Sequence, residues 1–81
     1  MSAEKGLNIE PIVIYVRLIG EGTTVFRPTQ GVPLGEGHYK LLPANDYDPD
    51  DETWEFLPGS VVCGEMRQLD GDVVMVAVGA G

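Results

Sequence analysis

Glycine and proline interrupt this sequence at short intervals. The chain contains 11 glycines and 6 prolines, and the segments between them are rich in Val, Ile, Tyr, Phe and Thr. Such residues favour strands, because β-branched and aromatic side chains pack well on a pleated surface. Apolar residues do not follow a helical spacing for more than two turns. The pattern therefore predicts an all-β domain, either a barrel or a sandwich.

The apolar alternation divides the first predicted strand, residues 12–19, into two faces. One face carries Ile12, Ile14, Val16 and Leu18, and the other carries Val13, Tyr15, Arg17 and Ile19. Further strands are predicted at 23–27, 38–42, 61–69 and 72–78, with a loop or irregular edge at 31–37 and a short extended piece at 54–56. Five strands without a helix favour an SH3-like barrel, since an OB barrel usually carries a helix between its third and fourth strands.

The strongest local signal is Asp70-Gly71 between two apolar segments. A two-residue Asp-Gly loop predicts a C-terminal β-hairpin with a type I′ turn, in which both central residues have positive φ. The resulting register places Leu69 opposite Asp72, Met66 opposite Met75 and Cys63 opposite Val78.

Length, charge and cysteine content limit the class of protein. The 81 residues allow one domain, predicted at residues 11–81 after a disordered tail at 1–10. A single cysteine and an N-terminus without a signal-peptide pattern predict a reducing, cytoplasmic location. The longest apolar segments are far shorter than the roughly 20 residues of a membrane helix. A formal net charge of −8 opposes binding to nucleic acid or membrane, so a charged partner should be basic.

The segment NDYDPDDETWEF, residues 45–56, contains six acidic residues alongside aromatic ones. It could be a calcium loop, the acidic lip of a binding groove or a solvated loop. Asp46, Asp48 and Asp50 match the first ligand positions of an EF-hand, but Asp51 replaces the required glycine and Leu57 the final glutamate. We therefore expect no metal site and no cofactor. The candidate contacts for a ligand or partner are Tyr39, Tyr47, Asp48, Asp50, Asp51, Glu52 and Trp54.

Catalysis is the least favoured reading of the sequence. The chain has one histidine, His38, and one cysteine, Cys63, and a catalytic pair would require the barrel to bring them together. Because no other acid–base constellation appears, we expect that the protein is not an enzyme.

Two stretches resemble known families. ANDYDPDDETWEFLPGSVV, residues 44–62, resembles the opening of a eukaryotic-type SH3 domain, in which the tyrosine and the acidic loop line a groove for proline-rich peptides. This resemblance covers about a quarter of the chain, and the 19 residues that follow it contain no aromatic residue. VRLIGEGTTVFRP, residues 16–28, together with DDETWEFLPGSVV, residues 50–62, is similar to a family of small bacterial cytosolic proteins whose function is uncharacterised. That resemblance implies a compact β-barrel and transfers no active site.

Two predicted strands are apolar on both faces, namely residues 12–19 and 73–78. A small barrel buries one face of each strand, and a contiguous apolar surface left outside usually marks an interface. Alternatively, residues 1–10 or the 28–37 loop could cover it. We predict a homo-oligomer, most simply a dimer, with candidate interface residues Val13, Tyr15, Val74, Val76 and Val78, or Val73, Met75 and Ala77 if the opposite face of the last strand points outward. The expected function is a non-catalytic accessory or protein-interaction module. The alternative is a barrel that binds a small ligand or cation through loop 45–56.

Overall fold

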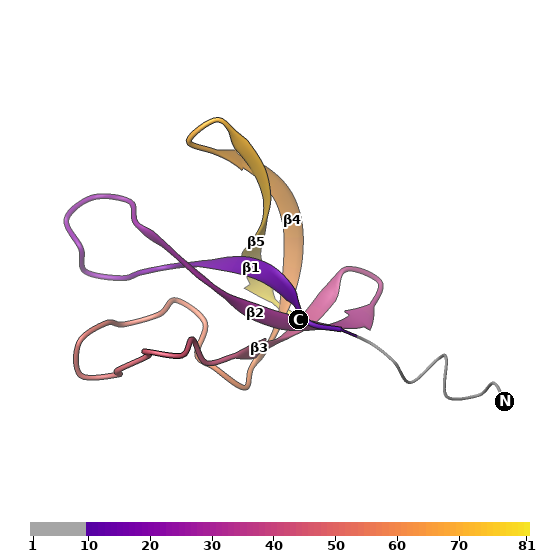
Figure 1. Cartoon of the computed structure of the whole chain (residues 1–81), viewed down its shortest axis with the longest axis horizontal. Coiled ribbons are helices and arrows are strands. Elements are labelled where there is room, and N and C mark those ends of the chain that lie inside the picture. The colour runs from indigo at the N-terminus through magenta and orange to yellow at the C-terminus, as the bar shows by residue number, and fades with distance from the viewer. Residues whose placement is uncertain (1–9) are drawn as a thin grey trace, which may run out of the picture.

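The computed structural model describes residues 10–81, which form a closed barrel of five strands (Figure 1). The strands are β1 (Ile12–Arg17), β2 (Phe26–Gly35), β3 (His38–Leu42), β4 (Val61–Leu69) and β5 (Asp72–Ala80). This confirms the prediction of a small, SH3-like all-β barrel. Most of the predicted tail, residues 1–9, lies outside the described residues. Nothing in the 10–81 region forms a helix long and apolar enough to cross a membrane.

The barrel closes through one parallel contact. Consecutive strands pair antiparallel, so directions alternate around the barrel. With five strands, the first and last run the same way, and β1 meets β5 in a parallel pair at Tyr15 and Val76. The β-ladder that closes the barrel therefore contains a single pair of residues.

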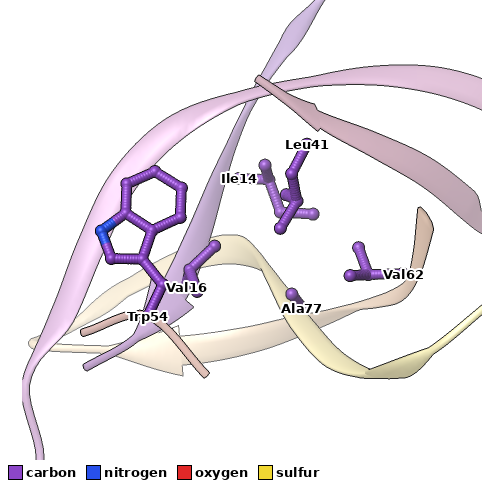
Figure 2. Packing of buried hydrophobic residues seen from close by; sticks show 6 residues of the cluster. All are labelled: Ile14, Val16, Leu41, Trp54, Val62 and Ala77. Carbon is purple, nitrogen blue, oxygen red and sulfur yellow. The ribbon is translucent and has the colours of Figure 1, made fainter. Parts of the chain in front are cut away.

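The core follows from the alternation predicted for β1. Ile14 and Val16 are fully buried, whereas Val13, which points to the opposite face, is 57% exposed. Figure 2 shows how side chains from several strands meet there: Ile14, Val16, Leu41, Trp54, Val62 and Ala77. Trp54 comes from the β3–β4 connection and lies beside Val16 at one end of this cluster (Figure 2). Trp54 also forms an isolated β-bridge with Leu18, but Glu55 and Phe56 lie in a bend, so the extended piece predicted at 54–56 is limited to Trp54.

β2 is longer than its sequence suggests, because it includes residues 31–35 of the segment expected to be a loop or an irregular edge. Its register with β3 is irregular between Pro33 and Gly35. Pro28 and Pro33 lie within β2, although proline cannot donate a hydrogen bond to a sheet. However, β2 pairs with β1 only up to Gly31 and with β3 only from Gln30 onward. Each proline therefore lies where β2 has a neighbour on one side only, and there a missing N–H costs little.

The C-terminal hairpin confirms most of the predicted register. Asp70 and Gly71 have φ values of 51° and 87°, as a type I′ turn requires. The pairs Leu69–Asp72 and Met66–Met75 form, but the predicted pair of Cys63 with Val78 is wrong. Cys63 pairs with Gly79 instead, because a bulge shifts the register between Cys63 and Gly64. An ideal Cβ on Gly64 would lie 2.7 Å from Tyr39 Cε1, so the Tyr39 ring packs directly over this bulge.

Gly71→Ala should destabilise the hairpin. An L side chain at a φ of 87° is strained, and we expect the free energy of unfolding to fall by about 1–2 kcal/mol, measured by urea denaturation. Gly79→Ala is the matched control, since nothing lies within 4 Å of its ideal Cβ and its φ is not in the left-handed region. Equal losses in the two variants would contradict the turn assignment.

Candidate functional site

Glu52 anchors the acidic segment 45–56 to the barrel. Its Oε1 accepts hydrogen bonds from Trp54 Nε1 at 2.6 Å and from Arg27 Nε at 3.2 Å. Arg27, on β2, also pairs with Asp46. The Trp54 side chain is 2% exposed, and the Tyr47 ring meets it edge-on with a centroid distance of 4.8 Å. Glu52 and Trp54 therefore hold the loop in place, and the buried indole offers no platform for a ligand.

The other predicted contacts do not converge on one site. Asp48, Asp50 and Asp51 are exposed, and Asp48 Oδ1 accepts a hydrogen bond from the Asp50 backbone N–H at 3.0 Å. The Asp48 carbonyl also accepts from the backbone N–H groups of Asp51 and Glu52. Tyr39 lies on β3, outside segment 45–56, and packs against the core. Among the described residues, no group of three or more His, Cys, Asp or Glu side chains is arranged to hold a metal ion.

A more continuous surface lies at the barrel seam. A groove of about 330 Å³ opens between β1 and the β4–β5 hairpin; this seam groove is lined by Ile12, Val13, Tyr15, Met66, Val73, Val74 and Met75. Three of its side chains are strongly exposed: Val13 at 57%, Met66 at 56% and Val73 at 64%. No charged residue belongs to the lining. The groove thus presents an apolar surface of the kind expected at an interface.

Comparisons with models of protein families, with curated proteins and with solved structures give no match for this chain. The resemblance to small bacterial cytosolic barrels stays a prediction. What the protein does is therefore inferred from its own geometry.

The predicted interface residues divide between the seam groove and the interior. Val13, Tyr15 and Val74 line the groove. Val76 is 4% exposed, and Val78 is half-buried beside the bulge. Sequence reasoning did not assign Met66 to this surface, although the predicted Met66–Met75 pair places it next to β5. Val73 and Met75 belong to the alternative outward face predicted for the last strand. Residues from both predicted faces of that strand therefore line the groove.

Folding brings His38 and Cys63 opposite each other in the β3–β4 pair. Strand order alone could not predict this proximity. Opposite residues share one face of a sheet, so the imidazole and the thiol are neighbours. The thiol donates to the Ala80 carbonyl, with an S–O distance of 3.7 Å. Neither residue belongs to the lining of the seam groove.

Proposed function

We propose that this protein is a non-catalytic interaction module of the bacterial cytoplasm that self-associates through the seam groove. The observation that carries the proposal is the set of exposed apolar side chains on both walls of the groove. Val13 belongs to the β1 wall, and Met66 and Val73 belong to the hairpin wall. A second copy that covers these side chains removes apolar surface from water, which stabilises the complex by roughly 25 cal/mol per Å².

A two-fold dimer is the simplest arrangement. In such a dimer the two copies meet through the same surface. That surface must therefore contain both projecting side chains and a hollow that receives those of the other copy. The seam groove provides both, since exposed side chains flank a hollow of about 330 Å³. The acidic segment 45–56 projects from the barrel on the side away from the β4–β5 turn (Figure 1). Two copies can therefore meet at the seam without placing their acidic loops in contact, and the net charge of −8 limits further growth.

Val73→Glu should dissociate the dimer and leave the chain folded. The side chain is 64% exposed, so a carboxylate stays hydrated in the monomer but is buried unpaired in the dimer. Sedimentation at roughly tens of micromolar should show a wild-type dimer and a monomeric variant. Leu57→Glu is the matched control, because Leu57 is 59% exposed but lies in the β3–β4 connection, and this variant should remain dimeric. A wild-type protein that sediments as a folded monomer would contradict self-association.

A basic protein partner fits the same module. The exposed carboxylates of Asp48, Asp50 and Asp51 create a negative potential that would speed the approach of a positively charged surface. The alternative of a small-ligand or cation site in segment 45–56 has less support. Its aromatic centre is buried, and both Glu52 and Asp46 are already engaged by Arg27.

A further inference from the structure

A second hollow lies at the tip of the β4–β5 hairpin. This tip cleft has a volume of about 470 Å³ and is bounded by the hairpin turn, by β1 and by the start of β2. Its lining residues are Tyr15, Thr24, Val25, Phe26, Gln68, Leu69, Asp70, Asp72 and Val74. The volume falls within the roughly 300–1,000 Å³ typical of small-molecule sites. The tip cleft shares Tyr15 and Val74 with the seam groove but contains neither Met66 nor Val73.

The lining of the tip cleft combines aromatic rings with carboxylates. Tyr15 and Phe26 contribute the rings, and Asp70 and Asp72 stand on either side of Gly71 in the turn. No Lys, Arg or His belongs to this lining. Over residues 10–81, neither carboxylate has a hydrogen-bonding or ion-pair partner in the structure. The cleft therefore has negative charge available beside aromatic surface.

We propose that the tip cleft binds a small organic cation, an ammonium group carried on an aromatic body. The ammonium group is attracted both by the carboxylates and by the faces of the aromatic rings. The apolar body packs against Val25, Leu69 and Val74. Neutral analogues of the same shape retain only the apolar contacts, and anionic analogues are repelled. This activity is additional to self-association.

The turn gives the site a fixed element. Asp70 has a φ of 51° and is held in the left-handed region by the type I′ geometry. Asn adopts this conformation at least as readily as Asp. Asp70→Asn and Asp72→Asn together therefore remove both charges while preserving the shape of the turn.

The proposal is tested with three probes that share a phenyl group and differ in charge. They are phenethylamine, protonated at neutral pH, 2-phenylethanol and 3-phenylpropanoate, titrated in turn and followed by amide chemical shifts. We expect saturable binding of phenethylamine, with shifts centred on the lining of the tip cleft. Affinity should be about 10-fold weaker for the alcohol, and no saturation is expected for the carboxylate.

Two pairs of substitutions make the test specific. Asp70→Asn with Asp72→Asn should weaken phenethylamine binding about 10-fold and leave 2-phenylethanol binding unchanged. Asp48→Asn with Asp50→Asn removes the same charge from segment 45–56 and should change phenethylamine affinity less than about twofold. Equal affinity for the amine and the alcohol, or equal losses in both double variants, would overturn the proposal.

Discussion

Val76→Glu should unfold this protein, whereas Val73→Glu on the same strand should leave it folded. Val76 is 4% exposed and Val73 is 64% exposed. A glutamate at position 76 would be buried without a partner, at a cost of roughly 5 kcal/mol, similar to the whole stability of a small domain. Circular dichroism and thermal melting of the two variants should show loss of the cooperative transition in Val76→Glu only.

This pair of variants also separates folding from assembly. If Val76 lay on an exposed face of β5, its replacement by glutamate would produce a folded monomer, as Val73→Glu is expected to do. A folded Val76→Glu protein would therefore contradict the burial of Val76 and the parallel contact with Tyr15.

Glu52→Ala should lower the free energy of unfolding by about 2 kcal/mol. The substitution leaves the Trp54 indole N–H without its acceptor and removes one of the two carboxylates that Arg27 contacts. Both effects occur in a partly buried setting, because the Glu52 and Arg27 side chains are 18% and 23% exposed. Urea denaturation followed by Trp54 fluorescence would measure the loss.

Two further variants show whether Glu52 acts by position or merely by charge. Glu52→Gln keeps an oxygen that can accept from the indole, so it should cost about half as much as Glu52→Ala. Asp50→Ala removes a carboxylate from the same loop, but Asp50 is exposed, and the expected loss is about 0.5 kcal/mol or less. Similar losses for Glu52→Ala and Asp50→Ala would refute the anchoring role.

Local patterns in the sequence predicted the parts of the fold that depend on near neighbours. The alternation around Ile14 and Val16 separated the two faces of β1, and Asp70-Gly71 predicted the hairpin turn. The extent of β2 could not be predicted in the same way. Whether Pro33 is tolerated depends on where β1 stops pairing, which is a property of the whole sheet.

The candidate sites were harder to predict, because they depend on residues distant in sequence. Glu52 and Arg27 are 25 positions apart, and their contact turns a predicted ligand site into a structural anchor. Residues 73–78 are all apolar, so the sequence could not assign Val76 to the inside or the outside of the barrel. The tip cleft joins Phe26 to Leu69, two residues that sequence analysis had no reason to associate.

When an odd number of strands pair antiparallel with their sequence neighbours and close into a barrel, the first and last strands must run parallel. Here that parallel pair is formed by Tyr15 and Val76. The β4–β5 ladder, by comparison, runs almost the full length of both strands. The seam groove opens at this junction, between the two neighbouring strands that share the shortest ladder. A second copy bound in the seam groove would contact both β1 and the β4–β5 hairpin and so help to hold the barrel closed. Under the proposed self-association, the concentration of the protein becomes one of the determinants of its own stability, because binding to the folded state draws the equilibrium away from the open chain.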